Sequence, residues 1–270
     1  MKRFILTASI CAFIVVVLKV FSFFDFESRE LVYTALSIGL FVLGSIFLKI
    51  TGPKMSRKRF LKLQFFKNQD FKLLLHMTVL VITGGFLINL LTITVLDLFG
   101  TTVPVSSFAM FDSDNMWLSV LTVAIVPAIF EELFFRGAVL SSLSSEKTIM
   151  AILISSVFFA AVHGSIYYLV SNFFAGIVFS LMVYITGSIF VSMTAHFLNN
   201  ILSYVLFVYS NRLTTVGFDA VVVWVLIFVF LVALYNTVGA TAKKYKDELK
   251  LDRPLVNEGE LLWEKRKEKR

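Results

Sequence analysis

Residues 116–140 read MWLSVLTVAIVPAIFEELFFRGAVL, and they place two glutamates and an arginine inside an otherwise uncharged apolar run. A helix of this length spans the roughly 30 Å hydrocarbon core of a bilayer. An ionised side chain at the bilayer centre costs roughly 2.5–3.5 kcal/mol, so Glu131, Glu132 and Arg136 must face a protein interior that provides partners. The stretch therefore predicts one helix of a bundle embedded in a membrane.

The composition of the whole chain agrees with this prediction. Of its 270 residues, 58% are hydrophobic and 16% are charged, against roughly 45–50% and 25% in soluble domains. We therefore expect an all-α, polytopic membrane helical bundle with about eight transmembrane helices. The eight apolar runs cover residues 4–24, 31–50, 73–99, 116–140, 148–163, 167–186, 187–209 and 220–242. The fifth run is short and the sixth nearly joins the seventh, so a re-entrant or broken arrangement there stays open.

The distribution of charge predicts the orientation. Residues 49–72 hold eight basic residues and one acidic residue, which equals the net charge of +7 of the whole chain. Because cytoplasmic loops retain Lys and Arg, this segment is expected inside, both termini are cytoplasmic, and the loops around Asp25 and Asp112 lie outside. The basic charge then reports topology and contact with the lipid bilayer, and we expect no nucleic acid partner.

The motif in the fourth run provides one paired and one separate carboxylate. Glu132 and Arg136 are four residues apart and share a helix face, whereas Glu131 is rotated by about 100° from Glu132. Arg136 can therefore compensate one carboxylate while the other remains available. Pro127 removes a backbone donor and is expected to kink the helix beside the motif. The alternative is a charge pair that only fixes helix packing.

Two further groups of polar residues lie in apolar runs. Residues 159–163 read FAAVH, and His163 at a helix end has the alternative of an interfacial group that bonds to a carbonyl or water. Residues 196–200 read HFLNN, which puts His196 and Asn200 on one helix face, either as an interhelical clamp or as donors to an oxyanion. The single cysteine, Cys11, excludes an internal disulfide and a CxxC metal site.

Together these residues have the chemistry that hydrolysis of a peptide bond needs. A buried Glu131 assisted by His163 can take a proton from water, and His196 and Asn200 can hold the resulting oxyanion. The sequence holds no HExxH zinc motif and no GxSxG nucleophile motif. Counted from the cytoplasmic helix ends, Glu131 lies roughly 13 Å deep and His163 over 20 Å deep. Tilt, or a helix start near Ser144, has to close that gap for the pair to act together.

The three motifs, EELFFR at 131–136, FAAVH at 159–163 and HFLNN at 196–200, occur in one order that resembles the CPBP family, also called the ABI family, of CAAX proteases and bacteriocin-processing enzymes. The resemblance implies an intramembrane glutamic endopeptidase related to the type II CAAX prenyl endopeptidase. It implies that Glu131, His163, His196 and Asn200 are catalytic and that Glu132, Arg136 and Phe159 support them. The resemblance leaves the use of a metal open. We expect no obligate metal, and the alternative is zinc held by Glu131, His163 and His196.

The expected organisation follows from the motifs and the runs. Residues 1–115 hold the first three transmembrane helices and the basic loop, 116–209 the protease-like core, 210–242 the last transmembrane helix and 243–270 a charged cytoplasmic tail. We expect a multi-pass protein of the plasma membrane that acts on a peptide or protein, lipidated or membrane-associated. The alternative function is a non-catalytic bacteriocin self-immunity or scaffolding protein that uses the same polar residues for binding, and a small-solute carrier ranks last.

Overall fold

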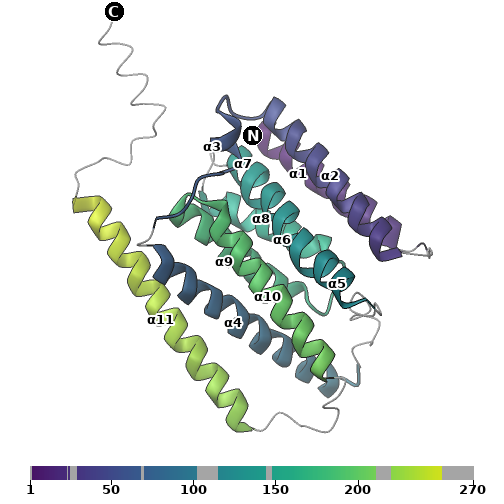
Figure 1. Ribbon diagram of the computed structural model, residues 1–270, viewed down its shortest axis with the longest axis vertical. Coiled ribbons are helices and arrows are strands. Elements are labelled where there is room, and N and C mark those ends of the chain that lie inside the picture. The colour runs from purple at the N-terminus through teal and green to yellow at the C-terminus, as the bar shows by residue number, and fades with distance from the viewer. Residues whose placement is uncertain are drawn as a thin grey trace, which may run out of the picture.

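A computed structural model describes residues 2–22, 24, 29–67, 70–101, 115–143, 148–210 and 220–250, and every regular element within these ranges is helical. Figure 1 shows the helices side by side as an elongated bundle. The loop residues Asp25 and Asp112, Ser144, and the tail beyond residue 250 lie outside the described residues. The orientation predicted from those loops stays a prediction.

The helices match the apolar runs closely. The long ones are α1 (Lys2–Ser22), α2 (Arg29–Thr51), α4 (Phe71–Leu98), α9 (Leu169–Thr186), α10 (Ile189–Ser210) and α11 (Ala220–Lys250). The fourth run forms one continuous composite helix, made of α5 (Met116–Ser119), η3 (Val120–Ile125), α6 (Val126–Glu132), η4 (Leu133–Val139) and α7 (Leu140–Leu143), in which η3 and η4 are π-helical. The short helices α3 (Arg57–Phe60) and α8 (Thr148–Val162) complete the fold.

The expected polytopic helical bundle is confirmed. Among the described residues, seven helices are long and apolar enough to cross a membrane. The eighth apolar helix, α8, has 15 residues, about 22 Å at 1.5 Å per residue, and is shorter than the hydrocarbon core. The sixth and seventh runs are two separate helices, because Gly187 with φ of 71° ends α9 and α10 starts two residues later. Gly187 tolerates this left-handed conformation since it has no Cβ.

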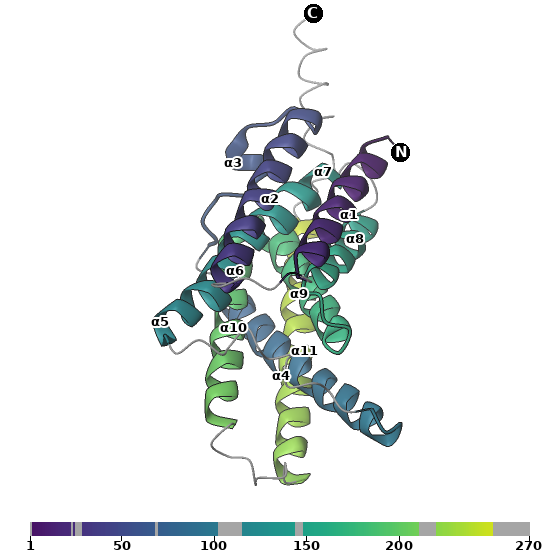
Figure 2. The same cartoon turned by 90° about the vertical axis from the view of Figure 1, so that its right-hand side faces the viewer.

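The composite helix lies in the middle of the bundle (Figures 1 and 2). The α1–α2 hairpin packs on one side of it, and α4 and α11 pack together on the other side, beyond α9 and α10. Phe41 of α2 stacks on Phe134 of η4 with 5.2 Å between ring centroids. A Cβ at Gly44 would lie 2.8 Å from the Phe134 ring, so this glycine allows the hairpin to approach the composite helix closely.

The basic segment after α2 covers one end of the bundle. Phe60 of α3 is fully buried, and its carbonyl accepts a hydrogen bond from Ser141 at 2.7 Å. Gln64 donates to the carbonyl of Gly187 at 2.7 Å, and Phe65 stacks on Phe190 with 5.0 Å between centroids. The segment thereby fixes the turn from which α10 carries His196 towards the centre.

Candidate active site

The hydrogen-bond pattern of the composite helix changes at Pro127. Pro127 lies at the start of α6, directly after the π-helical stretch η3. In an α-helix its missing N–H would leave the carbonyl of Val123, four residues earlier, without a donor. The side chain of Asn200 supplies a donor, because its Nδ2 lies 3.0 Å from that carbonyl oxygen. The Val123 carbonyl is therefore an acceptor that anchors α10, and the expected kink at Pro127 stays a prediction.

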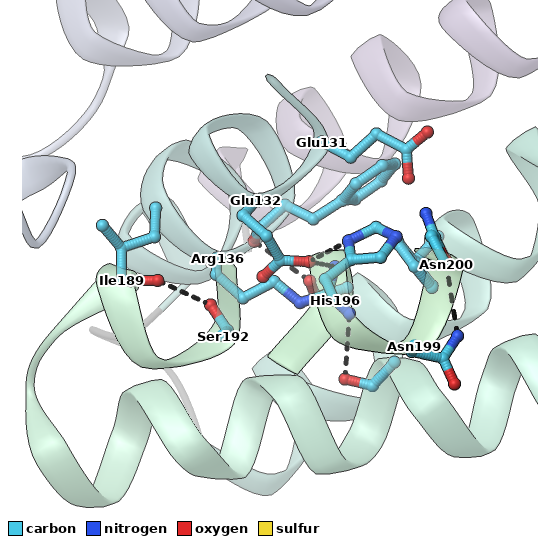
Figure 3. A network of polar contacts seen from close by, with 12 residues as sticks. Glu131, Glu132, Arg136, Ile189, Ser192, His196, Asn199 and Asn200 are labelled. Atoms are coloured by element: carbon cyan, nitrogen blue, oxygen red, sulfur yellow. Dashed lines mark hydrogen bonds and ion pairs between the residues drawn. The ribbon is translucent and has the colours of Figure 1, made fainter. Parts of the chain in front are cut away.

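Glu132, Arg136 and His196 form a buried network. The carboxylate oxygen Oε1 of Glu132 lies 2.9 Å from Nη1 of Arg136 and 3.0 Å from Nδ1 of His196, and both side chains of the ion pair are 0% exposed. The second arm of the guanidinium donates to the carbonyl of Gly176 at 3.2 Å. Figure 3 shows this network and shows Glu131 pointing away from it. Glu132 is thus bound in the buried network with Arg136 and His196, whereas Glu131 lies outside it.

Phe159 forms an aromatic wall of the network. The Arg136 guanidinium carbon lies 4.1 Å from the centroid of its ring, a distance at which the cation is attracted to the ring face. The same ring lies edge-on to both His163 and His196, at 4.7 and 5.5 Å between centroids. Phe159 therefore touches three of the polar residues and fixes their spacing.

Glu131 and His163 meet despite their different expected depths. The Oε2 atom of Glu131 lies 3.8 Å from Nε2 of His163, and the side chains are 15% and 28% exposed. The register of the two antiparallel helices explains this, because Ser155 bonds to the Phe135 carbonyl at 3.0 Å. Measured along the helix axes from this hydrogen bond, His163 lies about 12 Å beyond Ser155 and Glu131 about 6 Å beyond Phe135, in the same direction. Side chains lean towards the N-terminus of their helix, so the two approach each other.

Hydrogen bonds define which ring nitrogens remain available. Nδ1 of His163 lies 2.7 Å from the carbonyl oxygen of Phe159, which only accepts, so Nδ1 carries the proton in the neutral ring. Nδ1 of His196 faces the Glu132 carboxylate and carries a proton for the same reason. Each neutral histidine then presents an unprotonated Nε2. A neutral His196 cannot donate to an oxyanion through Nε2.

The three residues predicted as alternative zinc ligands lie together. Glu131, His163 and His196 each offer a donor atom, and these atoms lie within 4.8 Å of one another. Both histidines also bond through Nδ1 to an oxygen, which is the arrangement that orients metal-binding histidines. The donor set therefore fits a tetrahedral zinc ion with one further ligand.

Helix α9 contributes residues that the sequence analysis did not select. The ring of Phe179 stacks on His196 with 5.1 Å between centroids, and the Gly176 carbonyl accepts from Arg136. A Cβ at Gly176 would lie 2.9 Å from Cα of Ser156, so the glycine allows α8 and α9 to pack closely. A phenylalanine and a glycine in an apolar helix have no pattern that separates them from ordinary packing residues.

Comparison with known proteins agrees with the three motifs. Residues 113–202 match the family described as Type II CAAX prenyl endopeptidase Rce1-like. The matched segment contains all of the motifs, so the resemblance to the CPBP family of CAAX proteases is confirmed. No curated protein and no solved structure matches the chain significantly. The match supports a membrane protease of the CAAX type.

Proposed function

We propose that the protein is an intramembrane endopeptidase in which Glu131, assisted by His163, activates the water that attacks a peptide bond. The observation that carries this proposal is the contrast between adjacent glutamates. Glu132 is buried in an ion pair with Arg136, whereas Glu131 is partly exposed beside His163 and its Oε2 has no hydrogen-bond partner among the described residues. A carboxylate that can accept a proton next to an available nitrogen suits a general base.

Charge balance suggests how the oxyanion is stabilised. In their ionised forms Glu131 and Glu132 bring two negative charges and Arg136 one positive charge into a largely buried cluster. An uncompensated charge there is costly. For His196 to hold the oxyanion its Nε2 must donate, and we propose that it carries a proton while Glu131 is ionised and acts as the base. The Asn200 amide uses one hydrogen for the Val123 carbonyl and keeps a second one.

The reaction then runs in two steps. Glu131 takes a proton from a water molecule that also hydrogen-bonds to Nε2 of His163, and the oxygen attacks the carbonyl carbon. The carbonyl oxygen takes the negative charge and is held by His196 and Asn200. As the tetrahedral intermediate collapses, the carbon–nitrogen bond breaks and Glu131 returns its proton to the leaving amine. The products are a new carboxyl terminus and a new amino terminus.

We propose that no metal is obligate, because Glu131 and His163 together already provide a base and a binding point for the water. Zinc is the alternative, and Glu131, His163 and His196 are the residues that would hold it. Bound zinc would supply a Lewis acid and would lower the energy needed to ionise its water. A chelator separates the two mechanisms.

The depth of these residues suggests the kind of substrate. Glu131 and His196 belong to helices that are long and apolar enough to cross a bilayer, and His163 directly follows the shorter apolar helix α8. We infer that the scissile peptide reaches into the membrane. We propose a peptide or protein substrate that is lipidated or membrane-associated, and a location in the plasma membrane. If the cleavage assay below is negative, the alternative is a non-catalytic function in bacteriocin self-immunity or scaffolding.

Cleavage assays on the three histidine variants test the proposal. Purified protein in liposomes is offered quenched peptides, prenylated and unprenylated, with and without chelator. Cleavage should be lost in His163→Gln and in His196→Gln, and it should persist in the control His76→Gln, whose residue lies on α4 outside the cluster. Equal cleavage by all variants would refute the assignment of His163 and His196. Loss of wild-type cleavage when chelator is added would favour zinc.

A further inference from the structure

The α1–α2 hairpin lies outside the segment that matches the protease family, yet it touches the helix end that carries His163. Figure 2 shows α1 beside α8, and the two helices are in contact. The ammonium group of Lys19, near the end of α1, donates a hydrogen bond to the carbonyl of Gly164. The hydroxyl of Tyr33 on α2 lies 3.5 Å from the carbonyl of Val162. These two contacts lie on either side of His163.

The contacts provide hydrogen-bond donors at the end of α8. The last four carbonyls of a helix lack partners within it, so other groups must supply donors to them. The carbonyl of Phe159 accepts from His163, and the carbonyl of Ala161 accepts from the Gly164 N–H at 3.3 Å. The hairpin supplies donors to the carbonyls of Val162 and Gly164, and the His163 carbonyl between them accepts from the Ser165 N–H at 2.9 Å. A cation at a helix C-terminus is also favourable because of the helix dipole.

The conformation of this turn decides where the imidazole lies. Nδ1 of His163 is bonded to the carbonyl four residues earlier on the same helix, so the ring follows any movement of the last turn. Helix α8 ends at Val162, His163 lies in the turn that follows, and Gly164 has φ of 75° directly after it. A change of this turn would therefore rotate the Nε2 atom away from Glu131, which it approaches to 3.8 Å.

The hairpin is a firm support for the turn because it is anchored on both helices. On α1 the side chains of Cys11, Ile14 and Leu18 are almost fully buried, and Lys19 follows the last of them. On α2, Phe41 stacks on Phe134 of η4, the stretch that directly follows Glu131 and Glu132. The hairpin thus joins the element that carries the glutamates to the end of the helix that carries His163.

We propose that Lys19 and Tyr33 are positioning residues, which hold the last turn of α8 so that His163 faces Glu131. The inference rests on the proposed function, since it concerns how His163 takes part in that reaction. It also gives the first two helices a part in catalysis, although neither of them holds a residue of the three motifs.

The test combines kinetics with a spectroscopic signal of His163. Lys19→Met keeps the length and apolar character of the side chain and removes the donor, Lys19→Arg keeps a donor, and Tyr33→Phe removes one hydroxyl. Lys243→Met and Tyr235→Phe are controls, at positions exposed on α11. The chain has three histidines, so nitrogen NMR of histidine-labelled protein resolves the ring of His163, identified by its loss in His163→Gln.

We expect Lys19→Met to lower kcat by about 10-fold to 100-fold, as small misplacements of reacting groups do, with KM within about twofold of wild type. Its His163 ring signals should shift from those of wild type, because the surroundings of Nε2 change when the turn moves. Lys19→Arg should restore both readouts, and Tyr33→Phe should move both in the same direction by less. The controls should match wild type.

Two results separate this inference from the proposed function. If His163→Gln abolishes cleavage while Lys19→Met keeps both kcat and the His163 signals of wild type, the positioning role is wrong and the protease stands. If no variant or wild-type protein cleaves any peptide but Lys19→Met still moves the His163 signals, the structural coupling stands and the protease proposal fails.

Discussion

Replacing Arg136 by methionine removes the positive charge from the buried network and leaves its partner behind. The side chains of Arg136 and Glu132 are both fully buried, and their ion pair is 2.9 Å long. Methionine fills a similar volume without a charge or a donor, so the variant tests the electrostatic contribution more than the packing. The lost interactions also include the hydrogen bond to Gly176 and the contact with the Phe159 ring.

The structure sets the size of the effect. Removing one partner of a buried ion pair costs about 3–5 kcal/mol because the other charge stays without compensation. His196 still donates to Glu132 at 3.0 Å, so we expect the lower end of this range. A cost of about 3 kcal/mol shifts the unfolding equilibrium by a factor of more than about 100.

The double variant Glu132→Gln, Arg136→Met provides the decisive comparison. It removes both charges, and the amide oxygen of glutamine still accepts from His196. We expect its free energy of unfolding to return to within about 1 kcal/mol of wild type, because no charge is left unpaired. Arg136→Lys keeps the charge but lacks the second arm that reaches Gly176, so its cost should lie between these values.

The assay is reversible unfolding by SDS in mixed micelles, followed by circular dichroism. A loss below about 1 kcal/mol in Arg136→Met, as for an exposed ion pair, would refute the network as described. A double variant that is less stable than Arg136→Met would also refute it.

Two further changes test the packing of the core. Asn200→Ala should lower the free energy of unfolding by about 1–3 kcal/mol, because it leaves the carbonyl of Val123 without a donor. The loss should be smaller in the Pro127→Ala background, where the backbone N–H of residue 127 becomes available. Equal losses in both backgrounds would contradict the pairing of Asn200 with this carbonyl. Gly176→Ala should destabilise by about 1–3 kcal/mol, since its Cβ would meet Ser156 at 2.9 Å. Gly39→Ala on α2, where no atom of the described residues lies within 4 Å of the added Cβ, should be neutral or stabilising. Unfolding curves of both variants check this, and equal effects would contradict the close α8–α9 contact.

The sequence predicts the membrane helices well because their signal is length and apolarity. The run at 148–163 became a helix that ends at Val162, one residue from its predicted end. The bonding pattern inside the fourth run was not predictable in this detail. Pro127 indicates a disturbance, but a π-helical stretch and a donor from Asn200 depend on a helix that lies 77 residues later in the chain.

The candidate site was also predicted only in part from the sequence. The spacing of Glu132 and Arg136 predicts their pairing, and the structure shows it at 2.9 Å. Depth counted along each helix put His163 too far from Glu131, because such counting ignores the register set by Ser155 and the lean of the side chains. Phe179 was not selected, since its role depends on the ring of His196 on another helix. The catalytic roles and the domain boundaries stay predictions.

The most direct test of the account compares Glu131→Gln with wild-type protein, using a peptide that wild type cleaves in liposomes. Glutamine keeps the size of the side chain and cannot take the proton from water. We predict that kcat falls by about 100-fold to 10,000-fold, with an unfolding free energy close to that of wild type, while Asp97→Asn, exposed at the end of α4, keeps full activity. Cleavage at the wild-type rate by Glu131→Gln would contradict the assignment of Glu131 as the base.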